Sequence, residues 1–242
     1  MFGLFALLAA CATSNSDVTR AQGIHDPFEA GNRKVHGFNK GLDKEIIRPV
    51  AYGYAAVVPF EIRSVIGNFA ENLSMPSVVV NSLLQGDLRG AGLSTVRFLF
   101  NSTIGIGGLV DAATEFKIDE HQTDFGETLA VWGVKEGAYL ELPLIGPSTQ
   151  RAAAGKVVDL FTNPLSYQLN SPEKYYGLRA SAMTRLSDRA RFGDTIDSVL
   201  YESADSYAQS RLIYLQNRRF ELGTASEGAD PYSDPYEDPY AQ

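Results

Sequence analysis

The chain has 242 residues, of which 44% are hydrophobic and 21% are charged, and its formal net charge is −8. This length and composition fit one large or two small globular domains and exclude a disordered chain. Because nucleic-acid binding needs clustered lysines and arginines, the acidic balance argues against a nucleic-acid partner.

The charge is unevenly distributed along the chain. From Glu227 to the end there are five acids and no bases, so residues 1–226 carry only −3. Residues 49–110 hold six charged side chains in 62 positions, whereas residues 173–222 hold fifteen in 50. The first stretch is unusually poor in charge, and the second is typical of a solvated surface.

The N-terminus predicts a lipoprotein signal peptide over 1–10. Its apolar run is far shorter than the roughly 20 residues that span a bilayer, but it has the length of a signal-peptide hydrophobic region. Leu8-Ala9-Ala10-Cys11 resembles the bacterial lipobox. That resemblance implies diacylglyceryl attachment to the Cys11 sulfur, cleavage before Cys11 and acylation of the new N-terminus.

Cys11 is the only cysteine, so neither an intramolecular disulfide nor a thiolate metal cluster is expected. Residues 11–24 are predicted to form a lipidated tether, and Ala12 after the cysteine favours the outer membrane by resemblance to sorting rules. A merely exposed or buried free thiol is the alternative. Residues 1–10 lack the basic start of a signal peptide, which leaves a start codon further upstream as an explanation.

The first helix is predicted to begin at Asp26 and to end by Arg48. Asp26, Pro27 and Glu29 have the pattern of N-cap, first helical residue and capping-box acid. Pro49 disfavours helical geometry in the residue before it, which sets the predicted end. The apolar stripe of this helix consists of Phe28, Val35, Phe38, Leu42 and Ile46.

The charge-poor stretch predicts short apolar helices broken by proline and glycine. One is expected from Pro59 to about Asn72, and Pro76 starts a second apolar segment that Gly86 stops. A third helix is expected to continue to Phe100. No window reaches the ~18 uninterrupted apolar residues of a transmembrane helix. Such helices can lie in the plane of a membrane or form a soluble core, and the predicted anchor favours the membrane plane.

The remainder of the folded region predicts further helices and one short strand or hairpin. A helix is expected over 125–132 with Gly133 just past its end, and 139–142 alternates as a strand does. Ser148 is expected to cap a helix that runs to about Phe161. Residues 173–222 are expected to hold one or two long helices.

Residues 223–242 predict an acidic, disordered tail in which Asp-Pro-Tyr occurs three times, at 230, 234 and 238. A solubilising tail is the favoured interpretation, and a docking peptide is the alternative.

No pattern in the sequence indicates an enzyme. The three histidines, His25, His36 and His121, form no HExxH motif. Ser94 lies in a segment that lacks the second glycine of a nucleophile elbow, so a surface phospholipase is a weak hypothesis. His121 and Asp124 are better explained as a polar surface loop than as a dyad. Neither a metal site nor a cofactor is expected, apart from the covalent lipid on Cys11.

The ordered motifs over about 24–220 resemble the MlaA (VacJ) lipoprotein family. They include Asp26-Pro27-Phe28-Glu29, Phe38-Asn39, Arg48-Pro49-Val50-Ala51, Leu84-Gln85-Gly86-Asp87, Asn101-Ser102-Thr103-Ile104-Gly105 and Tyr139-Leu140-Glu141-Leu142-Pro143.

The resemblance implies a mainly α fold, a single ring-shaped helical domain over 25–222 with short amphipathic membrane-plane helices and at most a small β-hairpin. It implies a lipoprotein in the inner leaflet of the Gram-negative outer membrane, facing the periplasm. Such a protein removes misplaced phospholipid from the outer leaflet and passes it to a soluble periplasmic lipid carrier. A trimeric porin is a further implied partner. A structural scaffold that recruits partners through the acidic tail is the alternative.

Four residues are candidates for the lipid path. Arg89 and Arg97 lie eight apart, close to one flank of a predicted helix, and are expected to steer lipid phosphate by charge-assisted hydrogen bonds. A structural ion pair or a snorkelled surface arginine is the alternative for each. Phe38 and Asn39 belong to the family pattern in the first helix, and the resemblance makes them gating or channel-wall candidates.

Overall fold

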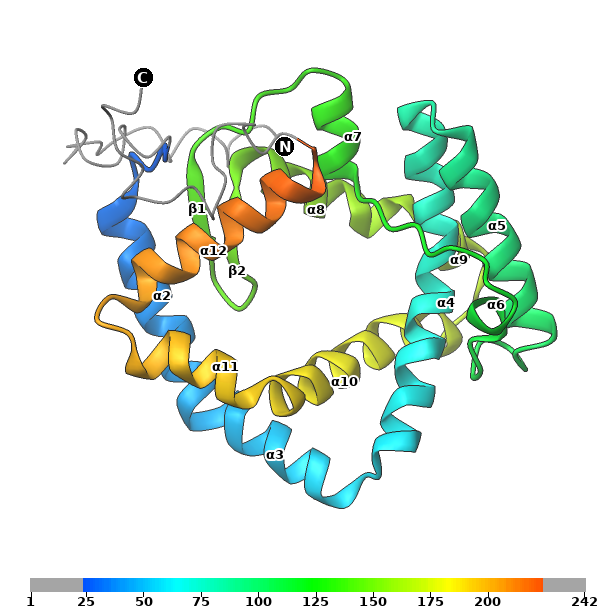
Figure 1. Ribbon diagram of the computed structural model, residues 1–242, viewed down its shortest axis with the longest axis horizontal. Helices are drawn as coiled ribbons and strands as arrows, with labels where there is room; N and C mark the ends of the chain where they lie inside the picture. The colour runs from blue at the N-terminus through cyan, green and yellow to red at the C-terminus, as the bar shows by residue number, and fades with distance from the viewer. Residues whose placement is uncertain (1–23, 224–242) are drawn as a thin grey trace, which may run out of the picture.

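The computed structural model describes residues 24–223. Figure 1 shows helices that follow one another around a ring, with one two-stranded hairpin between them. This architecture confirms the predicted mainly α, ring-shaped fold with a small hairpin. The predicted signal peptide, the tether around Cys11 and the acidic tail after Gly223 lie outside the described residues.

The helical elements and strands have the following bounds in chain order: α2 (Glu29–Leu42), η2 (Asp43–Ile47), α3 (Arg48–Val57), α4 (Phe60–Gln85), α5 (Leu88–Thr103), α6 (Ala112–Glu115), α7 (Phe125–Val131), β1 (Tyr139–Leu142), β2 (Gly146–Thr149), α8 (Gln150–Thr162), α9 (Leu165–Gln168), η3 (Glu173–Tyr175), α10 (Tyr176–Arg191), α11 (Gly193–Asp197), η4 (Ser198–Glu202) and α12 (Ser206–Glu221). Here η2 and η4 are π-helical turns, and η3 is a 3₁₀ turn. The strands pair antiparallel, with Tyr139 opposite Thr149. Within residues 24–223, every helix falls short of the length and hydrophobicity needed to cross a bilayer.

The first helix begins at Glu29, two residues later than the capping pattern, with Pro27 as the first helical residue, predicts. No side chain caps α2, and Asp26 is used elsewhere. Its carboxylate accepts hydrogen bonds from Asn32 at 2.9 Å and from Tyr207 and Arg211 of α12. The predicted N-cap therefore ties the two ends of the ring together.

Pro49 does not end the helix, contrary to the prediction. The π-helical turn η2 precedes it, and the Arg48 amide donates to the Asp43 carbonyl, five residues back. This wider turn gives the proline ring space that a regular α-helical turn denies it. The chain therefore passes from α2 into α3 without a loop.

Pro76 also lies within a helix, because α4 is a single helix of 26 residues. The prediction of two segments separated near Pro76 was wrong. In the turn before the proline, the Leu73 carbonyl accepts a hydrogen bond from the Asn163 side chain at 2.8 Å. A tertiary partner thus satisfies backbone near the site where proline perturbs the helix.

The predicted stops and hairpin are confirmed. Gly86 ends α4 in the left-handed conformation with φ 77°, and Asp87 caps α5 by accepting from the Gly90 amide. Gly133 follows α7 with φ 84°. The cap of α8 is Thr149, the last residue of β2, rather than the predicted Ser148, because the Thr149 hydroxyl accepts from the Ala152 amide.

The last helix, α12, returns to the first helix and to the hairpin and so closes the ring (Figure 1). A small apolar cluster of Ile24, Tyr139, Tyr207 and Leu215 lies at this junction. Asn32 of α2 bonds twice to one edge of β1, because its amide donates to the Tyr139 carbonyl and its oxygen accepts from the Glu141 amide. The junction therefore combines aromatic packing with buried polar contacts.

Replacing Arg211 with Ala is expected to destabilise the fold by about 3–5 kcal/mol, because it leaves the fully buried Asp26 carboxylate without its cation. Chemical denaturation of the purified protein measures this loss. The matched control is Arg33→Ala at the same junction, whose pair with Asp205 is 40–45% exposed and is expected to cost no more than about 1 kcal/mol. Equal losses in the two variants would contradict the assignment of the closure to Asp26.

Candidate functional site

A cavity of about 460 Å³ lies between α4 and α10. Its charged lining consists of Arg63 and Glu71 from α4 and of Arg185, Asp188 and Arg191 from α10. Within the described part of the chain, none of the three arginines forms an ion pair with a carboxylate. The cavity therefore carries positive charge that the described residues leave available for a ligand.

Two of these arginines are held in place by contacts that do not neutralise them. Arg63 donates to the Val58 carbonyl at 3.1 Å and to the Ser187 hydroxyl at 2.9 Å. The guanidinium groups of Arg63 and Arg191 both lie over the Phe60 ring, at 5.7 and 5.9 Å from its centroid. An aromatic face attracts a cation without cancelling its charge, so Phe60 positions both groups.

The acidic side chains of the cavity are unequal in their environment. Burial raises the pKa of Glu71, the charges of Glu120 and Asp111 act in the same direction, and Arg97 opposes them. Asp188 is exposed on α10 and takes part in no ion pair among the described residues. Three cations thus face one partly buried acid and one solvated acid.

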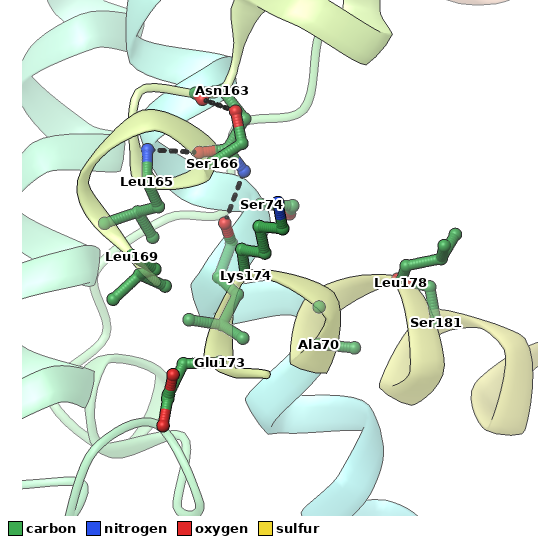
Figure 2. A pocket seen from close by; sticks show the side chains of 12 residues that line it. Ala70, Ser74, Asn163, Leu165, Ser166, Leu169, Glu173, Lys174, Leu178 and Ser181 are labelled. Carbon is green, nitrogen blue, oxygen red and sulfur yellow. Dashed lines mark hydrogen bonds between the residues drawn. The ribbon is translucent and has the colours of Figure 1, made fainter. Parts of the chain in front are cut away.

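Two smaller cavities extend this surface along α4, and Ser74 lines all three. One, of about 290 Å³, reaches the loop at His121 and the side chain of Asp159. The other, of about 200 Å³, lies between α4, α9 and α10; Figure 2 shows its lining, with Lys174 and Glu173 near its edge. A continuous surface of mixed polar and apolar side chains therefore follows α4 past its contact with α10.

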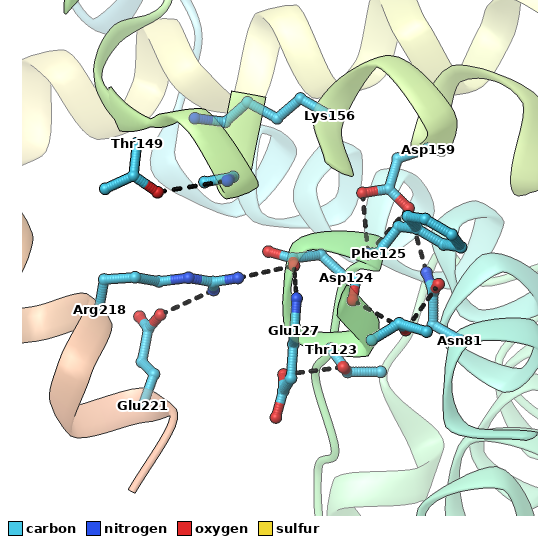
Figure 3. Close-up of polar contacts among 12 residues, drawn as sticks. Asn81, Thr123, Asp124, Phe125, Glu127, Thr149, Lys156, Asp159, Arg218 and Glu221 are labelled. Carbon is cyan, nitrogen blue, oxygen red and sulfur yellow. Dashed lines mark hydrogen bonds and ion pairs between the residues drawn. The ribbon is translucent and has the colours of Figure 1, made fainter. Parts of the chain in front are cut away.

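A polar cluster fixes α4, α7 and α8 to one another (Figure 3). The Asp159 carboxylate accepts from the Asn81 amide and from the Phe125 backbone, both at 3.1 Å. Burial raises the pKa of Asp159, although these hydrogen bonds act against the shift. With its oxygens used in this way, Asp159 is a structural acid rather than a free one.

Lys156 on α8 is a half-buried cation that does not line the arginine-lined cavity. Burial lowers the pKa of Lys156, the charge of Asp124 opposes this shift, and the charges of Arg218 and Arg185 add to it. Arg218 is neutralised by Asp124 at 2.7 Å, as Figure 3 shows, whereas the Lys156 ammonium lies 3.2 Å from the Ser148 hydroxyl and 6.0 Å from the centroid of the Tyr214 ring.

The structure separates Arg89 from Arg97, which were predicted to share one flank. Arg97 is 1% exposed and pairs with Asp111 at 3.1 Å and with Glu71 at 3.6 Å. It also donates to the Ile118 carbonyl at 2.7 Å, so the prediction that it meets lipid phosphate is corrected to a structural ion pair. The Arg89 side chain is 84% exposed, 3.9 Å from Asp119, and does not line the cavities along α4.

Phe38 and Asn39 lie on α2, away from the arginine-lined cavity. Phe38 is exposed. Asn39 donates to the Leu142 carbonyl at 3.0 Å and accepts from the Leu144 amide at 2.8 Å, so it holds the hairpin turn. A gating role for either residue stays a prediction.

The candidate catalytic groups are not assembled. Ser94 is fully buried in α5, which argues against the surface phospholipase hypothesis. His121 lies beside Asp87, with Nε2 3.4 Å from its carboxylate, rather than forming the considered pair with Asp124. No cluster of metal-ligating side chains occurs among residues 24–223.

The sequence patterns did not predict the residues that line the arginine-lined cavity. Arg185 and Arg191 belong to the segment interpreted as a solvated surface, and Arg63 is an isolated charge in a charge-poor helix. Their only signal in the sequence is that Arg63 is one of six charges in 62 residues. Their relation appears when the ring brings α4 against α10.

Comparisons with known proteins agree with this architecture. Residues 24–221 match the profile of the family described as MlaA lipoprotein. The chain is 36% identical over 218 residues to the intermembrane phospholipid transport system lipoprotein MlaA of Escherichia coli (strain K12), covering 88% of this chain and 84% of that protein. The protein of the same name from Haemophilus influenzae is 32% identical over 230 residues, covering 90% and 89%.

The fold is also similar to that of a solved structure. That structure is described as the structural basis for maintenance of bacterial outer membrane lipid asymmetry. The TM-score between the two structures is 0.70, and the two sequences are 34% identical. The match covers 81% of this chain and 98% of the other.

Replacing Arg97 with Met is expected to lower stability by about 3–5 kcal/mol, since Asp111 and Glu71 lose their buried cation. Chemical denaturation measures the loss. Arg89→Met on the same helix is the control and is expected to change stability by less than about 0.5 kcal/mol. An Arg97→Met protein as stable as the unmodified chain would restore Arg97 as a residue available for ligands.

Proposed function

Because this chain belongs to the MlaA lipoprotein family, we propose that it takes part in intermembrane phospholipid transport and maintains the lipid asymmetry of a Gram-negative outer membrane. It removes phospholipid misplaced in the outer leaflet and breaks no bond in it. The observation that carries the proposal is the cavity between α4 and α10, in which Arg63, Arg185 and Arg191 have no carboxylate partner among the described residues.

The chemistry of the cavity suits a phospholipid headgroup. A phosphate group that leaves water loses its hydration, and this loss is costly unless new hydrogen bonds take the place of those to water. Guanidinium groups supply such hydrogen bonds well, because their fixed fork of N–H donors matches the phosphate oxygens. Arg185 and Arg191 stand about one and two-thirds turns apart on α10, and Arg63 faces them from α4, so donors reach the cavity from two sides.

The surface of the charge-poor helices suits the acyl chains and the membrane. Val57, Leu88 and Ile106 are 82%, 75% and 68% exposed. Exposed apolar side chains of this number mark a surface that meets lipid or protein. Other large apolar residues exposed on this part of the chain are Val50, Tyr52, Phe60, Ile62, Leu83, Leu84, Val96, Leu99, Ile104, Leu109 and Val110.

In this proposal, lipids on Cys11 anchor the protein in the inner leaflet with its periplasmic side accessible. Two or more chains give stable attachment where one gives only marginal binding. A soluble periplasmic lipid carrier receives the phospholipid, and a trimeric porin holds the ring in the membrane. The scaffold alternative requires the acidic tail over 223–242 but no cation-lined cavity, so the arginines favour transport.

Replacing Arg185 and Arg191 together with Gln is expected to reduce phospholipid transfer at least about tenfold, because each removes hydrogen bonds to a charged phosphate worth roughly 1.5–3 kcal/mol. The assay follows labelled phosphatidylglycerol from vesicles that contain the lipidated protein to the soluble carrier. Arg179→Gln is the control, since Arg179 is exposed on the same helix and does not line the cavity.

A double variant that transfers lipid as fast as the unmodified protein would contradict the role of the cavity. Mass spectrometry of the transferred lipid is expected to show intact phosphatidylglycerol, and appearance of lysophospholipid would instead indicate hydrolysis.

Replacing Cys11 with Ser is expected to move the protein from the membrane fraction to the soluble fraction and to remove the mass of the attached lipid. Membrane fractionation and mass spectrometry measure these two effects.

Deletion of 223–242 is expected to leave phospholipid transfer within about twofold of that of the full chain, as the transfer assay measures. If the tail deletion abolished the cellular phenotype while the Arg185 and Arg191 variants kept it, the scaffold alternative would replace transport.

A further inference from the structure

A separate cavity, of about 410 Å³, lies between α2, the β1–β2 hairpin and the segment from α11 to α12. These elements lie on the opposite side of the ring from the contact between α4 and α10 (Figure 1). The volume is within the range of small-molecule sites. The apolar side chains that line it are Leu42, Ile47, Leu144, Ile145, Pro147, Ile196 and Leu200.

The acids at the edge of this cavity are already used by the protein. Asp43 accepts two bonds from Arg189 and one from Tyr201, at 2.7–2.8 Å. Glu141 faces His36 at 3.3 Å and accepts from the Tyr139 hydroxyl. Asp43 is therefore paired with Arg189, and the Glu141 oxygens are engaged by His36 and Tyr139, so among the described residues neither acid forms an ion pair with Lys40.

Lys40 supplies a cation at this edge of the cavity. Its ammonium lies 3.5 Å from the Ser206 hydroxyl and 5.6 Å from the centroid of the Tyr201 ring. In the described ranges it forms no ion pair with a carboxylate. The cavity therefore has a long apolar wall and, at one side, a half-buried positive charge with a place for an anion.

The hairpin turn presents an apolar side chain to this cavity at a cost in backbone strain. Leu144 has φ +67°, a conformation that bulky residues rarely adopt, and its residue surface is 69% exposed. Asn39 holds the turn by accepting from the Leu144 amide. Strained positions that persist in a fixed surrounding often belong to binding sites.

We propose that this cavity binds one acyl chain of a phospholipid, with the lipid phosphate at Lys40 and the turn at Leu144 and Ile145 lying along the chain. The inference rests on the proposed function and adds to it a second lipid site, distinct from the arginine-lined cavity. Its charge and its apolar wall match an anionic headgroup joined to a hydrocarbon chain, whereas free phosphate would leave the apolar wall empty.

The test uses the lipidated full chain in vesicles that contain phosphatidylglycerol with a diazirine at the end of one acyl chain. After illumination, mass spectrometry is expected to find cross-links at 142–147 and 196–200. Leu200→Trp, which fills the cavity, is expected to reduce these cross-links about tenfold and to leave those near Arg185 unchanged. Leu212→Trp, at an exposed position of α12 that does not line the cavity, is the control.

A second variant tests the phosphate contact without altering the cavity wall. Lys40→Gln is expected to weaken labelling by the phosphatidylglycerol probe about tenfold and to leave labelling by a diazirine diacylglycerol, which has no phosphate, unchanged. Equal effects on both probes, or none on either, would overturn the placement of phosphate at Lys40.

The transfer assay separates this inference from the proposed function. Lipid transfer without cross-links at 142–147 and 196–200 would overturn the second site and leave transport standing. Cross-links at these positions without transfer would support the site and overturn the transport function. Labelling of Leu200→Trp equal to that of the unmodified protein would also overturn the site.

Discussion

The contact between Asp26 and α12 decides whether this chain forms a ring or an open arc of helices. A ring has no centre in which one hydrophobic core can form, so each helix contacts mainly its neighbours. In the described residues, sixteen polar or charged residues are buried against fourteen apolar ones, and the compact apolar cluster at the closure contains only four buried residues. Because apolar burial is spread thinly, buried polar contacts must set the geometry, and Asp26 joins the first residues of the ring to its last helix.

The same constraint separates structural arginines from those available to a ligand. Arg97, Arg189 and Arg211 are buried, and each is paired with acids from other parts of the chain. Removing either partner of such a pair leaves a buried charge uncompensated, so these groups are committed to the fold. Among residues 24–223, Arg63, Arg185 and Arg191 lack this pairing, and they share one cavity. Exposure alone would not have distinguished them, since Arg89 is more exposed and has no place in that cavity.

Local rules predicted elements whose outcome depends on a few adjacent residues. Gly86 and Gly133 ended helices where expected, and the alternation at 139–142 became one strand of a hairpin. The two prolines misled the prediction, because Pro49 follows a π-helical turn and Pro76 lies inside one continuous helix of 26 residues.

The candidate site was harder to predict because burial and ion pairing are tertiary properties. Periodicity placed Arg97 on a helix flank, but it could not show that Asp111 and Glu71 would enclose it. Arg63 and Arg185 are separated by more than a hundred residues, and only the packing of α4 against α10 brings them to one cavity. The family resemblance supplied the ring shape, which the residue pattern alone left open between a membrane-plane set of helices and a soluble core.

The two π-helical turns have a consequence for how the ring obtains its curvature. The turn η2 inserts an extra residue into a continuous helix, which shifts the following side chains by about 100° around the helix axis, whereas η4 forms the C-terminal end of the helix that begins with α11. The turns η2 and η4 meet through the Tyr201 hydroxyl and the Asp43 carboxylate. The phase shift at η2 redirects the packing face from α2 to α3 without a loop, and a bend at 203–205 leads from η4 into α12. Deleting one residue in η2 would leave the helix continuous while rotating the side chains of α3 out of register, so the curvature there depends on the count of residues as much as on their chemistry.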